Sequence, residues 1–463
     1  MSADLATFSK ALDATYADLN ASLKKLPRTY QWRIEQLKAL KRLLEENDEV
    51  LSQAMWKDLR KSASECQSTE QGVVLAEIEF TLKHLKKWMR PKKVSTPIYN
   101  QIGTSHIVHD PYGLVLIIGA WNYPLNLTLA PLVGAICGGN GAIVKPSEMA
   151  ANTSQVIADL IPKYLDTNFF AVVQGGIEET NLVLAKRFDM IFFTGSGSVG
   201  KIILAKAAPH LTPVTLELGG KSPAVVLNDA DVEVSARRLA WGKFMNAGQT
   251  CVAPDYIIVT QKMRDSLVAQ IIKSLKDFYG EDAAKSLDYC RIINSKNFDR
   301  LLTLLPGADI LHGGISDRTS HFIAPTIIAA TPESAAMQDE IFGPILPILV
   351  MDDVEKILDF INSRPKPLAL YLFTKDADAV QRFTNETSSG ALCINDVVIH
   401  MPMASLPFGG VGASGMGHYH GRFSFETFTH AKGVLKKSFL FDVPLRYAPY
   451  TKLKTRILRW LFK

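Results

Sequence analysis

Leu114-Val115-Leu116-Ile117-Ile118 is a short run of residues that are all apolar. Three more runs of this kind follow it, with helical stretches between them: Ala142-Ile143-Val144, Phe170-Ala171-Val172-Val173 and Met190-Ile191-Phe192-Phe193. Strands that are apolar on both faces and alternate with helices are typical of a parallel sheet covered on both sides. The runs therefore predict an α/β fold built around such a sheet.

Each run is followed by a polar or glycine-rich segment. In chain order these segments are Gly-Ala-Trp-Asn-Tyr-Pro, Lys-Pro-Ser-Glu, Gln-Gly-Gly and Thr-Gly-Ser-Gly-Ser-Val-Gly. Ligands of open parallel sheets bind beyond the carboxyl ends of the strands. We therefore expect a binding site along this edge of the sheet.

A second α/β series begins at residues 222–226. It continues through a helix at 231–245 and strands at 256–260, 346–351 and 368–374, and a glycine-rich segment at 407–417 closes it. We place a domain boundary near Glu217. Before the first sheet, residues 28–90 carry apolar residues at helical spacing, with charged residues on the other faces.

The bulk composition bounds the class of protein. A chain of 463 residues exceeds one ordinary core, and 47% hydrophobic with 21% charged residues is typical of a globular protein. Residues 1–10 have no apolar core, and no stretch approaches the roughly 18 apolar residues of a membrane span. The five cysteines are widely spaced without a CxxC pair, so we expect no metal site and a cytoplasmic location.

A candidate nucleophile stands at the end of Met245-Asn246-Ala247-Gly248-Gln249-Thr250-Cys251. Glu217 lies 34 residues upstream, at the end of an apolar run. A thiol can attack an electrophilic carbon, and a carboxylate can activate water. Considered alone, a single cysteine is more often a small buried hydrophobe and a single glutamate a solvated surface group.

Residues 195–200, Gly-Ser-Gly-Ser-Val-Gly, form a literal G-x-G-x-x-G between a strand and a helix at 201–207. This pattern indicates a dinucleotide site, with Glu217 near the position of the acid that would bind the ribose. However, it follows the fourth βα unit of the series, whereas the fingerprint belongs on the first. A glycine-rich turn that packs a helix on a sheet explains the pattern equally well.

Six segments together resemble the aldehyde dehydrogenase superfamily, in order across nearly the whole chain. They are Trp121-Asn122-Tyr123-Pro124, Val144-Lys145-Pro146-Ser147-Glu148, Phe193-Thr194-Gly195-Ser196, Leu216-Glu217-Leu218-Gly219-Gly220-Lys221-Ser222-Pro223, Gly248-Gln249-Thr250-Cys251 and Glu340-Ile341-Phe342-Gly343-Pro344. The motifs from Ser405-Leu406-Pro407-Phe408 to Ser424-Phe425-Glu426-Thr427-Phe428 resemble its class 3 branch, which includes fatty-aldehyde and aromatic-aldehyde dehydrogenases.

The resemblance implies a domain organisation. A Rossmann-like, parallel-sheet NAD-binding domain would span residues 1–90 and 107–217, and a second α/β catalytic domain residues 218–428. Residues 91–106 and 429–463 would form a small β bridging element for oligomerisation. The class 3 resemblance also implies a homodimer, and we expect no nucleic-acid partner.

The resemblance further implies an oxidation of an aldehyde to the free carboxylic acid. Cys251 would attack the aldehyde to give a thiohemiacetal, which is oxidised to a thioester. The side chain of Asn122 and the backbone N–H of Cys251 would stabilise the oxyanion. Glu217 would then activate the water that hydrolyses the thioester.

The implied cofactor is NAD, with NADP as an alternative. Lys145 and Glu148 would hold the adenosine ribose, Glu340 the nicotinamide ribose, and Phe342 would lie against the nicotinamide. The helix start at Gly195, Ser196 and Gly200 would face the pyrophosphate, whereas Gly197 would be incidental. Glu148 would repel a 2′-phosphate, which favours NAD, although class 3 members often accept NADP.

The positive charge of the chain is concentrated at its end. Residues 431–463 hold nine Lys or Arg against Asp442, a net charge of +8, so the preceding residues sum to −3 of the overall +5. Leu453, Ile457, Leu458 and Leu461 form a helical stripe among these basic residues. Such a helix suits peripheral contact with an anionic membrane, but we favour packing on the body or on a partner subunit.

Two rival activities remain open from sequence. In a CoA-acylating aldehyde dehydrogenase the thioester passes to CoA, which requires no water-activating Glu217. A cysteine esterase or hydrolase would use Cys251 without a nicotinamide and leaves Lys145 and Glu340 unexplained. Tyr123, Trp241 and Phe408 near the motifs suit a hydrophobic aldehyde, aliphatic or aromatic.

Overall fold

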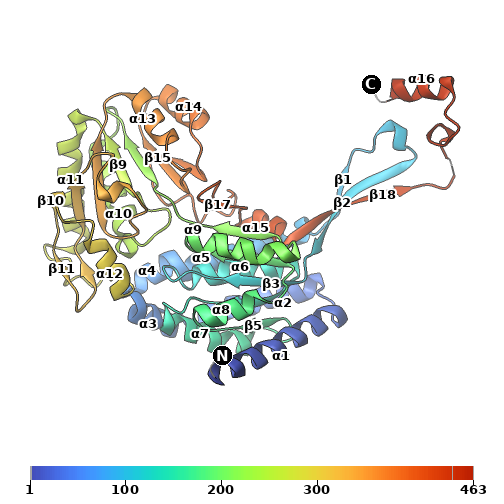
Figure 1. Ribbon diagram of the computed structural model, residues 1–463, viewed down its shortest axis with the longest axis horizontal. Helices are drawn as coiled ribbons and strands as arrows, with labels where there is room; N and C mark the ends of the chain where they lie inside the picture. The colour runs from blue at the N-terminus through green and yellow to red at the C-terminus, as the bar shows by residue number, and fades with distance from the viewer. Residues whose placement is uncertain (1–2, 441, 462–463) are drawn as a thin grey trace.

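The computed structural model describes residues 3–440 and 442–461, which form a two-part body and a projecting arm (Figure 1). One part is built on a six-stranded sheet and the other on a seven-stranded sheet, and the arm is a three-stranded antiparallel sheet. The predicted α/β class with a small β element is confirmed.

The six-stranded sheet contains all four apolar runs as strands. Its order is β17-β7-β6-β3-β4-β5, parallel except for β17, and the strands are β3 (Leu114–Ile118), β4 (Gly141–Lys145), β5 (Phe170–Val172), β6 (Met190–Thr194), β7 (Val214–Glu217) and β17 (Gly415–Met416). Alternate residues of β3 face opposite sides: Val115 and Ile117 belong to one apolar core, and Leu114, Leu116 and Ile118 to another. Burial on both faces explains why the runs are continuously apolar.

Two sets of helices form these cores. Leu12 and Leu19 of α1 (Ala3–Lys25) lie in one core with α8 (Ile177–Leu184), α9 (Gly197–Ala207) and one face of β3. The other core contains residues of α2 (Tyr30–Glu46), α3 (Asp48–Leu59), α5 (Gly72–Trp88), α6 (Asn126–Gly138) and α7 (Ala151–Tyr164). The sequence pattern did not anticipate α1.

The charged residues of the segment 28–90 require a correction. We expected them on solvated faces, but Lys61, Glu70 and Glu77 are buried. Lys61 precedes α4 (Ala63–Cys66), Glu70 lies in a π-helical turn, η1 (Gln67–Gln71), and Glu77 lies in α5. Buried charges are rare unless paired, and these three have polar partners.

The seven-stranded sheet has the order β10-β13-β14-β9-β8-β15-β16 and is parallel except for β10. Its strands are β8 (Pro223–Val226), β9 (Tyr256–Val259), β10 (Asp309–His312), β13 (Thr326–Ala329), β14 (Ile345–Val350), β15 (Ala369–Phe373) and β16 (Ala391–Ile394). The associated helices are α10 (Val232–Phe244), α11 (Gln261–Tyr279), α12 (Ser295–Leu302), α13 (Val354–Asn362) and α14 (Ala377–Glu386). The hairpin β11 (Ser316–Asp317) and β12 (Phe322–Ile323) stands apart.

The arm consists of β1 (Lys92–Val94), β2 (Gly103–Pro111) and β18 (Thr429–Lys437), with β2 in the middle. The helix α15 (Gly421–Thr427) leads into β18, and α16 (Lys452–Leu461) lies at the outer end of the arm, away from the body (Figure 1). Because β2 runs continuously from 103 to 111, the predicted boundary between residues 106 and 107 falls inside a strand. The domain limits otherwise remain predictions.

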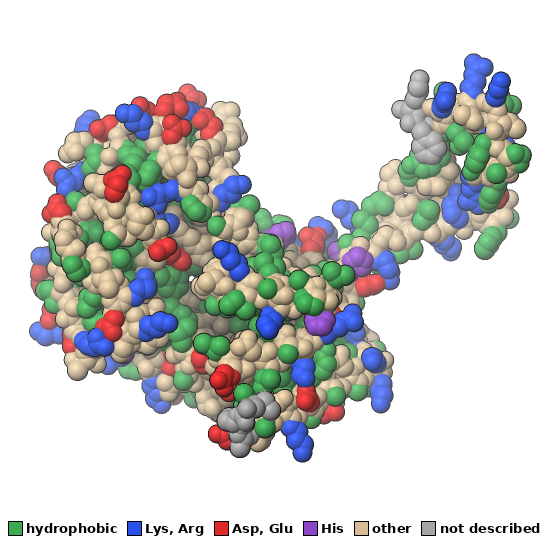
Figure 2. Space-filling view, in the orientation of Figure 1, with side chains coloured by type: hydrophobic (Ala, Val, Ile, Leu, Met, Phe, Trp, Pro, Cys, Tyr) green, Lys and Arg blue, Asp and Glu red, His purple; other side chains and the backbone are tan. Residues whose placement is uncertain are grey.

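Neither α16 nor the strands bury the apolar side chains of the arm. Ile98, Ile102, Phe439, Leu440 and Trp460 are exposed, and Figure 2 shows apolar and basic side chains mixed over this region. The expected packing of the tail on the body is therefore not present within this chain. In the described part of the chain, no helix combines the length and apolarity needed to cross a membrane.

Candidate active site

The strand ends of the six-stranded sheet bring together most of the predicted site residues. Asn122 follows β3, Lys145 ends β4, Gly195 and Ser196 follow β6, and Glu217 ends β7. Since β4, β3, β6 and β7 are parallel neighbours, these ends lie along one edge of the sheet. This is the edge at which parallel sheets bind ligands.

The turn before Cys251 comes from the other sheet domain. After α10, the backbone of Asn246, Ala247 and Gly248 is left-handed, with φ of 52°, 50° and 74°. A Cβ on Gly248 would collide with the carbonyl oxygen of Gly343, so only glycine fits. The Asn122 amide nitrogen donates a hydrogen bond of 3.0 Å to the carbonyl oxygen of Gln249, which places Asn122 beside the loop of Cys251. A second amide hydrogen of Asn122 remains for an oxyanion.

Glu217 is the carboxylate at this junction. It is 3% exposed, and neither of its oxygens has a hydrogen-bond partner among the described residues. Burial raises its pKa well above the usual range for glutamate. An unpartnered carboxylate with a raised pKa is suited to accept a proton from a thiol or from water.

Cys251 is held as a thiol at neutral pH. Burial, the carboxylate of Glu340 and the carboxylate of Glu217 raise its pKa to about 12, in that order of influence. The charges of both acids therefore act on the Cys251 thiol. A thiol with so high a pKa needs a base nearby to become a nucleophile.

Lys145 and Glu148 form an ion pair of 3.1 Å at the end of β4. Lys145 is 3% exposed, whereas the Glu148 side chain is 44% exposed. A cation and a carboxylate that meet at the surface edge can bind the two hydroxyls of a ribose. The pair thus fits the predicted adenosine site.

The start of α9 presents open backbone N–H groups at the same edge. The Ser196 hydroxyl caps the helix by accepting a hydrogen bond from the N–H of Val199. A Cβ on Gly195 would come within 2.5 Å of the Phe193 ring, and one on Gly200 within 3.1 Å of Leu218, whereas one on Gly197 would meet nothing within 4 Å. This helix start fits a pyrophosphate, and Gly197 has no packing role there.

Glu340 and Phe342 approach the site from the loop before β14. A Cβ on Gly219 would collide with the Glu340 carboxylate, so Glu340 lies against the segment that follows Glu217. Burial and the charge of Asp255 raise the pKa of Glu340 to about 8. The Phe342 ring meets the Trp121 ring edge-on at 5.3 Å. Lys145, Glu148, the start of α9 and Glu340 together fit a nicotinamide dinucleotide.

The three aromatic residues expected near the substrate differ in position. The Tyr123 hydroxyl is hydrogen-bonded to that of Thr250 at 2.6 Å, next to Cys251. Phe408 is buried and precedes Gly409, whose added Cβ would lie 3.1 Å from a Glu217 oxygen. Trp241 lies in α10 and is 39% exposed. Tyr123 and Phe408 are thus next to the catalytic groups.

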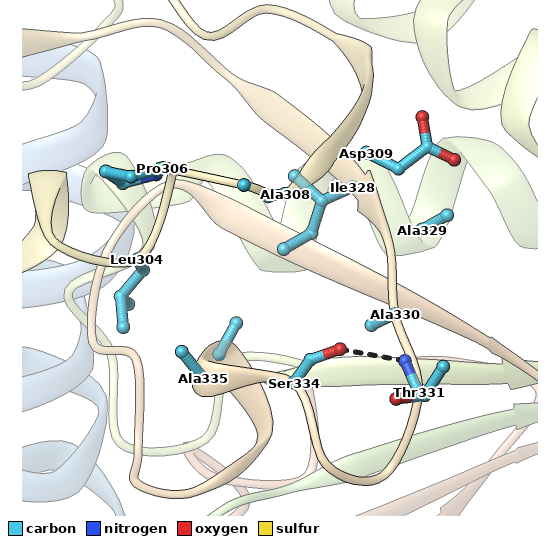
Figure 3. Close-up of a pocket in the computed structure, with 12 residues that line it drawn as sticks. Leu304, Pro306, Ala308, Asp309, Ile328, Ala329, Ala330, Thr331, Ser334 and Ala335 are labelled. Atoms are coloured by element: carbon cyan, nitrogen blue, oxygen red, sulfur yellow. Dashed lines mark hydrogen bonds between the residues drawn. The ribbon is translucent and has the colours of Figure 1, made fainter.

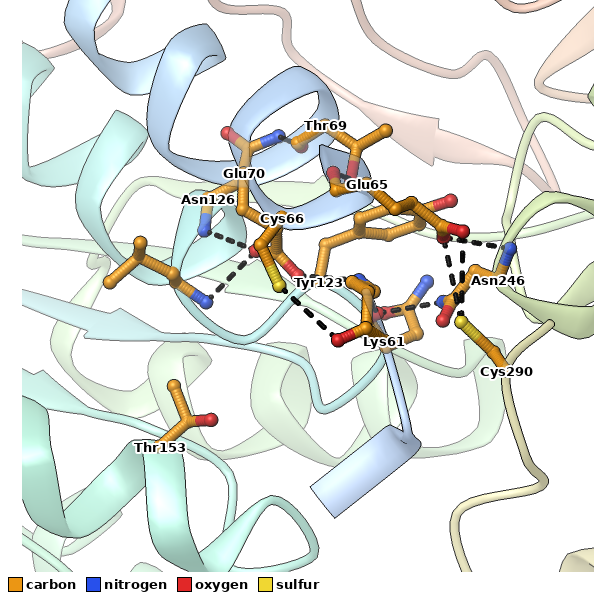
Figure 4. Close-up of polar contacts among 12 residues, drawn as sticks. Lys61, Glu65, Cys66, Thr69, Glu70, Tyr123, Asn126, Thr153, Asn246 and Cys290 are labelled. Atoms are coloured by element: carbon orange, nitrogen blue, oxygen red, sulfur yellow. Dashed lines mark hydrogen bonds and ion pairs between the residues drawn. The ribbon is translucent and has the colours of Figure 1, made fainter. Parts of the chain in front are cut away.

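Sequence reasoning missed the buried polar groups beneath the site (Figure 4). Lys61 donates to the Asn122 carbonyl oxygen at 3.2 Å, and Asn246 donates to the same oxygen at 2.8 Å. The Gln249 side chain donates to the carbonyl oxygens of Asn246 and Arg291. The left-handed Asn246 beside Gly248 was a signal of a constrained turn, but no pattern pointed to Lys61.

A separate pocket lies at an edge of the seven-stranded sheet (Figure 3). It is lined by the segment around Pro306, by β13 and by residues 330–336, and it contains none of the predicted site residues. Its lining is mostly small and apolar, with Asp309 as the charged member. The site chemistry therefore resides at the strand ends of the other sheet.

Comparisons with known proteins agree with this geometry. Residues 2–434 match the model of the Aldehyde dehydrogenase family. The dimeric NADP-preferring aldehyde dehydrogenase of Rattus norvegicus is 50% identical over 89% of this chain and 91% of that protein. Aldehyde dehydrogenase family 3 member A2 of Rattus norvegicus is 48% identical over 92% and 89%. The structure of substrate-bound Staphylococcus aureus AldH is 45% identical, with a TM-score of 0.95 over 97% of this chain and 99% of that chain.

Proposed function

The chain belongs to the aldehyde dehydrogenase family and oxidises aldehydes to carboxylic acids with NAD or NADP, and we propose that its substrate is a hydrophobic aldehyde. The observation that carries the proposed chemistry is the hydrogen bond from Asn122 to Gln249 in the loop of Cys251, together with the buried carboxylate of Glu217 at the end of β7. We assign Cys251, Glu217 and Asn122 the roles of nucleophile, base and oxyanion donor.

The first step is the formation of a carbon–sulfur bond between Cys251 and the aldehyde carbon. Glu217 accepts the thiol proton, because burial makes its carboxylate a stronger base. The free amide hydrogen of Asn122 and the backbone N–H of Cys251 then stabilise the oxygen that becomes negative. These residues thus hold the thiohemiacetal.

The chemistry that bound NAD or NADP supplies is hydride acceptance, which turns the carbon held on Cys251 into a thioester. Lys145, Glu148, the start of α9 and Glu340 would hold that cofactor. Glu217 first releases the thiol proton to solvent and then takes a proton from water, which attacks the thioester carbon, and the bond to the Cys251 sulfur breaks. The product is the free acid, and Cys251 recovers its proton.

Glu217 also decides between this activity and its rivals. A CoA-acylating enzyme requires no buried base for water, and an esterase requires none of the cofactor residues. The buried carboxylate of Glu217, which has no hydrogen-bond partner in the described part of the chain, favours hydrolysis. The hydrophobic substrate class is supported by the buried aromatic rings of Tyr123 and Phe408 near the catalytic groups and by the relatives of the class 3 branch.

We also propose a homodimer in the cytoplasm. The name of the rat relative describes that protein as dimeric, and the exposed apolar side chains of the arm need to be covered. Cytoplasmic location is supported by the free, widely spaced cysteines. A dimer would leave α16 less exposed, so we do not assign it to a membrane.

The test is turnover of an aldehyde panel with NAD and with NADP. The panel contains aliphatic aldehydes of increasing chain length and benzaldehyde- and cinnamaldehyde-type compounds. We expect kcat/KM to rise with apolar size and the free acid to form in step with the reduced cofactor. Acid formation only after addition of CoA, or turnover without NAD(P), would contradict the proposal.

A further inference from the structure

Lys61 and Glu70 hold the loop of Asn122 from below. Their side chains are fully buried and form an ion pair of 2.6 Å. Lys61 also donates to the carbonyl oxygen of Asn122 at 3.2 Å. The second carboxylate oxygen of Glu70 accepts hydrogen bonds from the backbone N–H groups of Leu125 and Asn126, at 3.1 and 2.9 Å. The pair therefore forms hydrogen bonds to both ends of the turn that carries Asn122.

Glu65 holds the loop of Cys251 from the same segment. It accepts a hydrogen bond of 2.9 Å from the backbone N–H of Asn246. The Asn246 side chain in turn donates to the carbonyl oxygens of Asn122 and Gln249, at 2.8 and 3.1 Å. One short segment thus contacts the loops of both the oxyanion donor and the nucleophile.

A third connection runs through Tyr123. The Lys61 ammonium lies 4.1 Å from the centre of the Tyr123 ring, a favourable cation–π distance. The Tyr123 hydroxyl is hydrogen-bonded to Thr250, the residue before Cys251. Figure 4 shows Glu65, Glu70 and Lys61 gathered around Tyr123, with dashed lines that join Glu65 to Asn246 and Glu70 to Asn126.

The segment that carries Glu65 and Glu70 contains an irregular helical turn. Residues Gln67–Gln71 form a π-helical turn, in which Gly72 donates its N–H to the carbonyl oxygen of Gln67. A Cβ on Gly72 would collide with that oxygen, so a regular side chain does not fit. Glu65 and Glu70, which lie on either side of the start of this turn, contact one loop each, and such turns are frequent at functional sites.

We propose that Lys61, Glu65 and Glu70 are positioning residues, a bracket that sets the place of the Asn122 amide relative to the Cys251 sulfur. The proposal rests on the function proposed above. The bracket contacts backbone groups of the two loops, so it acts on the reaction only through Asn122 and Cys251. A small displacement of a reacting group can cost about 100-fold in rate.

The central test uses a double variant, Lys61→Met with Glu70→Gln. Removing one charge alone leaves the other buried and unpaired, which can prevent folding. The double variant removes both charges, so we expect a melting temperature near that of the wild type. We expect kcat for aldehyde oxidation to fall about 10- to 100-fold with KM changed less than about threefold. A double variant that is as stable as the wild type and has the same kcat would overturn the proposal.

Glu65 is tested with a conservative pair. Glu65→Gln keeps an oxygen that accepts the Asn246 N–H, so its kcat should lie within about threefold of the wild type. Glu65→Ala removes that acceptor, and its kcat should fall about tenfold or more. Equal kcat values for the two variants would contradict the assigned role of Glu65.

A cycle with Asn122→Ala tests whether the bracket acts through Asn122. The Asn122→Ala protein lacks the amide that donates to the oxyanion. Adding Lys61→Met and Glu70→Gln to it should therefore lower kcat by less than about threefold. Fully additive losses of kcat would overturn the proposal.

The matched control is Asp58→Ala, because Asp58 accepts from the backbone N–H groups of Asn152 and Thr153 at the start of α7, as Glu70 does at α6. This variant should lose stability and keep kcat at saturating cofactor.

Cleavage of p-nitrophenyl acetate separates the two proposals. It requires the Cys251 nucleophile and the oxyanion donors but no cofactor and no aldehyde. The bracket variants should lower its rate as they lower aldehyde oxidation, and Asp58→Ala should not. If the wild type did not oxidise aldehydes, the proposed function would be wrong. The rates of ester cleavage by the bracket variants would still show whether the bracket positions Asn122 and Cys251.

Discussion

Two buried glutamates, Glu70 and Glu217, have completely different surroundings. Glu70 is paired with Lys61 and accepts two backbone N–H groups, so its carboxylate is fully satisfied. Glu217 is buried to a similar degree but has no hydrogen-bond partner among the described residues. The oxygens of the first carboxylate are engaged by neighbouring groups, whereas those of the second remain free to exchange a proton.

The presence or absence of hydrogen-bond partners distinguishes a structural role of a buried glutamate from a chemical one. A partnered, buried carboxylate stabilises what it holds, and breaking the pair is costly. An unpartnered one costs stability in its charged form and gains basicity. The four predictions that follow either break or sharpen this contrast.

Glu70→Gln should show the largest effect, on stability. It leaves the Lys61 ammonium buried beside a neutral amide, so the free energy of unfolding should fall by about 3–5 kcal/mol. Chemical denaturation at pH 8, followed by circular dichroism, measures this loss. A change below about 1 kcal/mol would show that the pair contributes little to the fold.

Asn122→Ala should lower kcat by about 100- to 1000-fold, since it removes one oxyanion donor. Its KM and its melting temperature should change little, because the Asn122 backbone carbonyl still accepts from Lys61 and Asn246. Steady-state kinetics on a hydrophobic aldehyde provide the measurement. A loss confined to KM would argue against a role in stabilising the oxyanion.

Glu217→Gln should change stability in the opposite direction to Glu70→Gln. The pKa of Glu217 is higher in the folded than in the unfolded chain, so the stability it contributes is present at acid pH and lost as pH rises toward the folded value. The variant should therefore match the wild type below about pH 4.5. Above that pH it should become progressively more stable, by about 1–3 kcal/mol. Thermal unfolding from pH 4 to 9 tests this sign.

Glu340→Gln should speed alkylation of Cys251 by iodoacetamide at alkaline pH. The Glu340 carboxylate is the strongest charged influence that raises the Cys251 pKa, and its own pKa is about 8. The variant should react several-fold faster above pH 8, and the difference should shrink below it, where Glu340 is protonated. Asp339→Asn, next in the chain and exposed, is the control. Equal rates at pH 9 would contradict the assigned influence.

Much of the fold could be predicted from particular patterns. The runs at 114–118 and 190–193 coincide with β3 and β6 because both faces of these strands are buried. Their shared parallel direction then places Asn122 and Glu217 at one edge. The helix α1 was missed, since its apolar residues contribute to a core shared with distant elements.

The bracket beneath the site could not be predicted in this way. A lysine or glutamate in an amphipathic helical segment indicates a solvated face, and Lys61 and Glu70 look no different in sequence from their exposed neighbours. Their burial follows from the Asn122 loop, which folds over them from more than fifty residues away. The literal G-x-G-x-x-G was also misleading in part, because Gly197 meets nothing that a side chain would disturb.

The most direct test of the account is a rapid-mixing measurement on Glu217→Gln with saturating aldehyde and NAD. Because Glu217 takes a proton first from the Cys251 thiol and later from water, the variant should form its first equivalent of NADH more slowly than the wild type and should then turn over about 100- to 10,000-fold more slowly. The acyl group should remain on Cys251, detectable by mass spectrometry of the quenched protein. Steady-state formation of the free acid at the wild-type rate would contradict the assignment of Glu217.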